Sequence, residues 1–173
     1  LAAGGRPTTY DTLAAVAQGF LPVEDLPTLI QEAVDGGVLP AVGDQPYWFR
    51  HPLLAEVLLS TFTPQELVSV HAAYAGDLET KLVIRPDLAG GLAADLALHH
   101  EGARQLDQAF AFSIRAAEFA HELNASAVEA AHLTRACALW ERAEAQMRES
   151  TEDRIALLLR TSRVGEQAGV LGP

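Results

Sequence analysis

The fold class of this chain is indicated by residues 106–122, which read LDQAFAFSIRAAEFAHE. Small Ala side chains recur in this stretch at helical spacing, and large aromatic side chains stand between them. Small residues let helix axes approach closely while larger ones fill the gaps, which is how antiparallel helical hairpins pack. We therefore predict a mainly α protein whose second half consists of antiparallel helical-hairpin repeats.

The rest of the second half continues this Ala-rich, helical pattern. The helices expected there cover residues 92–102, 106–122, 125–147 and 152–168. Ser126 and Glu129 have the spacing of a capping box, and Ser150 and Gly169 are the expected ends of the last helix. No strict 34-residue period is visible, so the repeats are expected to be degenerate.

Two helices are predicted near the start of the chain. Thr8 or Thr9 can cap the first, which Gly19 can end. The second covers residues 24–35, where apolar residues recur at helical spacing. It should stop at Gly36 and Gly37, and Gly36 is expected to take a positive φ.

Two further helices are predicted before residue 83. Pro52 suits the first position of one of them, and a capping box formed by Thr63 and Glu66 begins the other. The first should bury a stripe of Leu53, Leu54, Val57 and Leu58. The second should bury a face of Leu67, Val70, Tyr74 and Leu78.

Between these helix pairs lies the segment of the chain that most resembles β-structure. Residues 38–42 are followed by a turn signal at residues 43–46 and by the aromatic run 47–49, which together predict a short hairpin. Pro40 and Pro46 should confine it to an edge. Two helices followed by a hairpin predict a winged-helix-like module over residues 1–82, joined through a loop at 83–91 to a repeat region over residues 83–173.

Composition narrows the class of protein. The net charge is −11, and residues 1–80 hold only two basic residues against ten acidic ones, which disfavours phosphate binding by the first half. The single cysteine, Cys137, excludes an internal disulfide and is typical of a reducing cytoplasm. No apolar run reaches a membrane span, and the start has no signal-peptide layout, so we expect a cytoplasmic piece of a longer protein.

Residues 49–56, which read FRHPLLAE, resemble a motif of the large ATP-binding regulators of the LuxR family. Shorter likenesses to this family occur at residues 36–39, at Val70-His71 and at residues 106–120, in the family's order. The resemblance implies a winged-helix-like segment and tetratricopeptide-like helices between a nucleotide-binding domain and a C-terminal DNA-binding helix-turn-helix. The chain departs from the family near Val68-Ser69, where a usual Arg is missing.

The same resemblance places the chemistry outside this chain. No phosphate loop and no basic recognition helix occur in the sequence, so ATP or ADP is expected only in an ATPase domain absent here. By analogy with related signalling ATPases, His51 would contact the nucleotide phosphate and hold the resting state. The alternative is that His51 packs where the wing meets the next helix.

The remaining candidate residues form an expected partner interface of Tyr47, Trp48, Arg50 and Glu56. Strand alternation should turn one or two of the aromatic residues 47–49 inward and leave the remainder as a docking patch. Arg50 and Glu56 should either pair with each other or face the missing domain.

Neither catalysis nor metal binding is predicted. The pair His99-His100 points in two directions on a helix and so chelates one ion poorly, and no nucleophile stands in a catalytic context. Cys137 is expected to be a small buried apolar residue.

The predicted function is therefore regulatory and non-enzymatic. The chain would contact protein partners, either neighbouring domains of its own protein or a second copy, without touching nucleic acid or membrane. The alternatives are a DNA-binding winged helix and a helical scaffold unrelated to transcription. The helix over 24–35 carries four acidic residues and no Lys or Arg, which argues against the first alternative.

Overall fold

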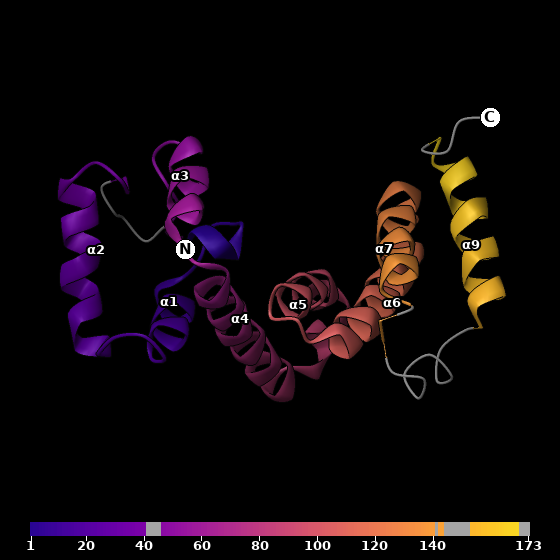
Figure 1. The fold of residues 1–173 in the computed structure, drawn as a ribbon, viewed down its shortest axis with the longest axis horizontal. Helices are drawn as coiled ribbons and strands as arrows, with labels where there is room; N and C mark the ends of the chain where they lie inside the picture. Colours follow the sequence, from indigo (N-terminus) through magenta and orange to yellow (C-terminus); the bar gives the residue numbers. More distant parts are fainter. Residues whose placement is uncertain (41–45, 141, 144–152, 170–173) are drawn as a thin grey trace. The chain divides into compact units, whose positions relative to one another are not determined.

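The computed structural model describes residues 1–40, 46–140, 142–143 and 153–169. These residues are mainly α-helical, which confirms the predicted class, and they contain no β-strand (Figure 1). The chain divides into two compact units, Leu1–Asp77 and Leu78–Pro173. Of the helices described, none combines the length and the hydrophobicity needed to span a lipid bilayer.

The first unit is built from short helices. They are η1 (Ala2–Gly4), α1 (Tyr10–Ala17), η2 (Val23–Asp25), α2 (Leu26–Asp35), α3 (Leu53–Thr61) and the beginning of α4 (Pro64–Ile84). Its buried apolar residues are few: Val16, Leu26, Leu39, Phe49, Tyr74 and Ala75. The first unit therefore has a small core for its length.

Two of the predicted helix starts are confirmed. The Thr9 hydroxyl accepts a hydrogen bond from the Thr12 amide at 3.4 Å, at the start of α1. At α4, the Thr63 amide donates to Glu66 at 2.7 Å, and the Glu66 amide donates to the Thr63 hydroxyl at 3.3 Å. This is the reciprocal capping box that the sequence predicts, with Pro64 at the first helical position.

The stop after α2 differs by one residue from the prediction. Gly36 has an ordinary φ of −75°, whereas Gly37 has a φ of 72° and is the left-handed residue. The Gly36 amide still bonds the Glu32 carbonyl at 2.8 Å, so Gly36 closes the helix and Gly37 turns the chain.

The predicted β-hairpin is wrong in the part that can be compared. Residues 41 and 42 of its first arm and 43–45 of its turn lie outside the described residues, and the described parts of its arms, at 38–40 and 47–49, form no strand. Among the residues that the structure describes here, one backbone bond links the two sides, from the Arg50 amide to the Val38 carbonyl at 3.0 Å. Tyr47 instead forms an isolated antiparallel bridge with Thr8. The amide and the carbonyl of Tyr47 are thus both hydrogen-bonded to the segment before α1. Neither group is available for a ladder between the two predicted arms.

The predicted burial of α3 is also wrong. Leu53 is 68% exposed and Val57 59% exposed, and no residue of α3 is buried. Within the small first unit α3 packs against η1, a single short turn that covers little of its surface. The apolar stripe of α3 is therefore largely open. By contrast, the face predicted for α4 packs inward, with Tyr74 and Leu78 buried and Leu67 and Val70 half-buried.

The boundary between the units lies inside a helix rather than in a loop. Helix α4 continues to Ile84, η3 covers Pro86–Leu88 and α5 begins at Ala89, so most of the predicted loop at 83–91 is helical. Pro86 occupies the first turn of η3, which needs no amide donor from it. Gly90 lies in the first turn of α5, where a Cβ would sit 2.3 Å from the Phe119 ring. Its small size permits this close approach.

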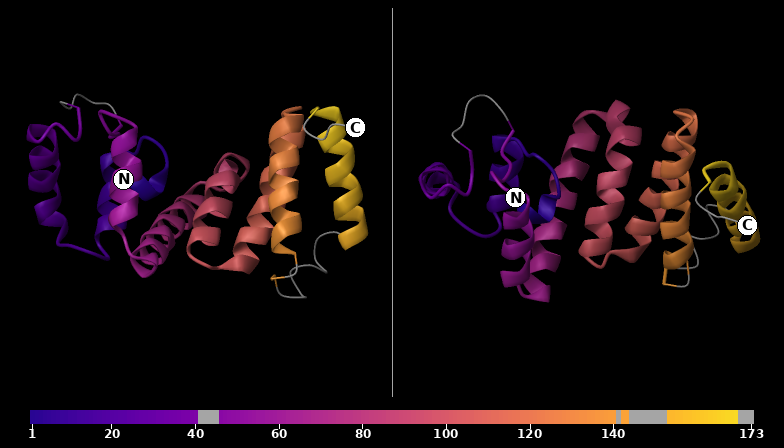
Figure 2. Two further views of the ribbon diagram at one scale, coloured as in Figure 1. Left: turned by 45° about the horizontal axis from the view of Figure 1, so that its top comes forward. Right: turned by 90° about the horizontal axis from the view of Figure 1, so that it is seen from above.

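In the described part of the second unit, four α-helices that follow α4 and η3 pack in chain order. They are α5 (Ala89–Gly102), α6 (Leu106–Glu122), α7 (Ser126–Leu139) and α9 (Arg154–Gln167). Helix α5 packs on α6, α6 on α7 and α7 on α9 (Figure 2). The core cluster shared by α6, α7 and α9 consists of Ala109, Phe110, Ile114, Ala117, Ala130, Leu133, Ala136, Leu139, Ala143, Leu157 and Val164. The rings of Phe110 and Trp140 pack edge to face, with their centroids 5.7 Å apart. This agrees with the prediction that large residues fill the gaps between small ones.

Two tight turns join the first three of these helices with the same backbone geometry. Arg104 and Asn124 have left-handed φ values of 61° and 55°. In the first turn the Gln105 amide bonds the His100 carbonyl at 2.8 Å, and in the second the Ala125 amide bonds the Ala120 carbonyl at 2.9 Å. Each turn thus satisfies helix carbonyls with backbone donors alone. The hairpins repeat in structure although the sequence shows no strict period.

The predicted helix ends of the second unit are confirmed in part, because α7 ends at Leu139 and not at residue 147 as predicted. Helix α6 has its predicted bounds, and α5 begins three residues early. Ser126 does not cap α7, because Ala125 is the cap residue and makes no side-chain bond. Ser150 lies outside the described residues, as do 144–147 of the predicted third helix. The side chain of Asp153 caps α9, and Gly169 follows it with a φ of 67°.

Candidate functional site

The predicted interface residues lie together in sequence but differ in burial. Tyr47 is half-buried, and its backbone exchanges two hydrogen bonds with Thr8, at 2.9 and 2.7 Å. Trp48 is half-buried and meets the buried Phe49 ring edge-on at 5.5 Å. Arg50 is exposed. Of the three aromatic residues, Phe49 alone is part of the core.

His51 and Glu56 have exposed side chains. His51 therefore does not pack where the predicted wing meets α3, and its carbonyl accepts the Leu54 amide at 3.0 Å. Arg50 and Glu56 form no ion pair with each other among the described residues, so their predicted mutual pairing is wrong. Arg50, His51 and Glu56 are all accessible to a partner.

A cavity of about 500 Å³ lies within the first unit. Residues of η1, α1, α2, α3 and α4 line it, together with Val38, Leu39 and Phe49. Every lining residue except Glu66 is apolar. These apolar side chains surround open space.

The carboxylate of Glu66, the one charged side chain that lines this cavity, is hydrogen-bonded within the protein. Oε2 of Glu66 accepts from both the amide and the hydroxyl of Thr63, at 2.7 Å each. These hydrogen bonds favour the ionised form and lower the pKa of Glu66. The carboxylate thus serves the start of α4, and the other lining side chains offer a ligand only hydrocarbon contacts.

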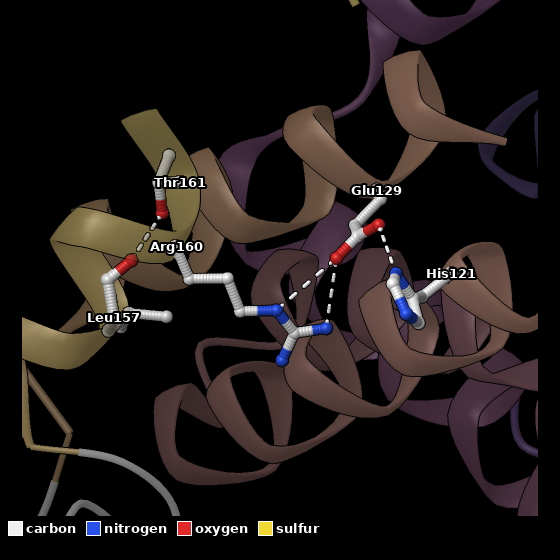
Figure 3. A network of polar contacts seen from close by, with 5 residues as sticks. All are labelled: His121, Glu129, Leu157, Arg160 and Thr161. Atoms are coloured by element: carbon white, nitrogen blue, oxygen red, sulfur yellow. Dashed lines mark hydrogen bonds and ion pairs between the residues drawn. The ribbon is translucent and has the colours of Figure 1, made fainter. Parts of the chain in front are cut away.

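A second polar arrangement lies in the other unit and centres on Glu129, whose side chain is 4% exposed (Figure 3). Its Oε1 accepts hydrogen bonds from Arg160 on α9, and its Oε2 lies 3.0 Å from Nδ1 of His121 at the end of α6. Because an ionised carboxylate only accepts, this contact requires the proton on Nδ1. One buried carboxylate therefore connects α6, α7 and α9.

His100 is a third buried polar residue, 2% exposed. Its Nδ1 lies 2.8 Å from Oε1 of Gln105, and its ring stacks on Phe112 with centroids 5.3 Å apart. Its Nε2 lies 3.3 Å from the Glu79 carboxylate, which is an ion-pair distance without hydrogen-bond geometry. His100 therefore joins α5 to the end of α4 and to the turn before α6, which is a structural role.

Sequence reasoning missed both Glu129 and the cavity. The spacing Ser126 to Glu129 predicts a cap, but Glu129 shares the buried face of α7 with Leu133 and Ala136. An acidic residue in register with buried apolar positions is the signal that identifies it, because buried carboxylates are nearly always paired.

Cys137 is half-buried, with Sγ 3.4 Å from the Thr161 hydroxyl.

The described residues were also compared with the arrangements that bind metal ions. No group of three or more His, Cys, Asp or Glu residues there is arranged to hold a metal ion. In comparisons with protein-family models, curated proteins and solved structures, the chain has no match.

Proposed function

We propose that this chain is a regulatory, protein-interaction fragment of a LuxR-family, ATP-dependent transcriptional regulator. In this proposal it relays signal or nucleotide state between an ATPase domain and a DNA-binding domain that both lie outside the chain. The observation that carries it is the packing of α5, α6, α7 and α9 in chain order, with equivalent turns. Arrays built in this way present extended surfaces to other proteins.

The charge of the first unit supports protein contacts over DNA contacts. Helix α2 stands at the place of a recognition helix in a winged-helix order, and Glu32 and Asp35 on it are exposed. Neither Lys nor Arg occurs in it or in the turn η2 before it. A major-groove reader needs cationic contacts to phosphate, which this helix cannot make.

Duplex titration and the flanking gene sequence test the proposal. With fluorescent duplex DNA at low salt, we expect no binding at micromolar protein. Binding at that concentration which weakens steeply with added salt would instead assign a DNA-binding function. The gene on either side should encode a phosphate loop upstream and a helix-turn-helix downstream. Their absence would leave a helical scaffold unconnected with transcription.

His51 provides a second test in the full-length regulator. Its exposed ring is free to meet another domain, so His51→Ala should raise transcription in the absence of inducer. Gln65→Ala, an exposed change on α4, is the matched control and should leave basal transcription unchanged. Wild-type basal activity in His51→Ala would remove the nucleotide-sensing part of the proposal.

A further inference from the structure

The cavity of the first unit is open to solvent and has the size of a small-molecule site. Protein interiors contain few voids larger than one water molecule, whereas ligand pockets span about 300–1,000 Å³. At about 500 Å³, this cavity falls in the second class. Five helical elements and the residues around Leu39 and Phe49 surround it. This volume suits a compact occupant.

The wall of the cavity selects an uncharged, largely hydrocarbon molecule. Phe20, Phe49 and Phe62 supply aromatic surface, and Leu13, Val16 and Leu58 supply aliphatic surface. The one ionisable side chain of the lining, Glu66, is engaged by Thr63. A ligand carboxylate or phosphate would lose its hydration without gaining a side-chain donor, and it would enter a unit with two basic and nine acidic residues.

The side of the cavity formed by α3 gives access from solvent. Leu58 is 36% exposed and Phe62 40% exposed, while Phe20 on another side is 49% exposed. Val16, Leu26, Leu39 and Phe49, at the other parts of the wall, are buried. The cavity therefore reaches from the small core of the unit to its surface.

We propose that this cavity binds one uncharged, apolar small molecule, with the rings of Phe20, Phe49 and Phe62 in contact with it. This site does not depend on the proposed regulatory function, because it follows from the volume and lining of the first unit alone. A ligand bound there would add the apolar contacts that the small core lacks and would stabilise the folded state by mass action.

A neutral fluorescent probe, N-phenyl-1-naphthylamine, tests the site in the whole chain. We expect saturable binding of one probe per chain, with a blue-shifted emission and a higher melting temperature. Ala33→Leu and Ala17→Leu add methyl groups to the wall and should weaken binding at least tenfold. Leu58→Asp places a charge at the opening and should have the same effect.

Leu159→Asp is the matched control. It makes the same chemical change at a side chain that is 60% exposed on α9 in the other unit, and probe affinity should not change. Circular dichroism and thermal melts establish that each variant is folded, and Leu58→Asp decides the matter if a wall-filling variant is not.

Three results would overturn the proposal. They are the absence of saturable binding, equal affinity in the wild type and the folded wall-filling variants, and equal loss in Leu159→Asp, which would indicate adsorption to exposed apolar surface. Size-exclusion chromatography adds a fourth: a dimer that forms without probe and excludes it would show that a second copy covers the cavity. None of these results bears on DNA binding or on the flanking gene, so the proposed function is tested separately.

Discussion

Arg160 donates two hydrogen bonds to a single oxygen of the buried Glu129 carboxylate, from Nε at 3.2 Å and from Nη2 at 3.0 Å. The two residues are 31 positions apart and connect α9 to α7. Burying a carboxylate without a partner carries a large desolvation penalty. Helix α9 therefore packs on α7 through apolar contacts and also through this ion pair, which favours one position of α9 over others.

Replacing Arg160 should leave the buried Glu129 carboxylate without its cationic partner. Arg160→Met is expected to lower the free energy of unfolding by about 2 kcal/mol, less than for a fully buried pair because the Arg160 side chain is 24% exposed. Arg163→Met, an exposed change on the same helix, should shift it by under about 0.5 kcal/mol. Urea unfolding measures both. Equal effects of the two substitutions would mean that the buried pair adds nothing to stability.

Gly90 and Gly91 should respond in opposite directions to alanine. In Gly90→Ala the new Cβ meets the Phe119 ring at 2.3 Å, so α5 or the ring must move, at about 1–3 kcal/mol. In Gly91→Ala the Cβ meets nothing within 4 Å, and the better helix propensity should stabilise by about 0.5–1 kcal/mol. Thermal melts compare the two. A stabilising Gly90→Ala would disprove the close packing of α5 on α6.

Arg104 occupies a left-handed conformation that suits glycine better. Arg104→Gly should relieve the strain of a φ of 61° and stabilise the chain by about 0.5–1 kcal/mol. The same change at exposed Glu118 in α6 should destabilise by about 1 kcal/mol. Denaturant melts of both variants provide the test, and destabilisation by Arg104→Gly would argue against this turn.

Two histidines should make the chain less stable in mild acid. Burial lowers the pKa of His71, and burial together with the charge of Arg135 lowers the pKa of His132. Between each folded pKa and the unfolded value of about 6.5, the unfolded chain binds more protons, so stability falls as pH falls through that window. Below the folded pKa this contribution stays lost and falls no further.

Melting temperatures between pH 7.5 and pH 5.5 should therefore decrease as the pH is lowered. The double variant His71→Gln with His132→Gln should show a flatter dependence over the same range. An unchanged slope in the double variant would assign the acid sensitivity to other groups.

Local signals in the sequence predicted the helices well, because caps and apolar spacing act within one element. Thr9, Thr63 and Gly169 mark helix ends through contacts to their own neighbours in the chain. The hairpin prediction failed because the Tyr47 backbone pairs with Thr8, which strand propensity does not encode.

The features that distinguish this molecule depend on partners far away in sequence. Glu129 was assigned to a cap because its arginine partner lies 31 residues away, on another helix. The cavity escaped prediction for a related reason. Apolar spacing at Leu13, Val16 and Leu26 shows which side chains turn inward, but it does not show whether their volumes fill the space between the helices.

The matched turns at Arg104 and Asn124 have a consequence for how this chain can change in length. Because both turns use the same backbone path and one left-handed residue each, α5 is joined to α6 in the same way as α6 is joined to α7. A helical hairpin could then be duplicated or deleted while the turns on either side of it kept the same geometry. Such an array can evolve by gaining or losing units without redesign of its core.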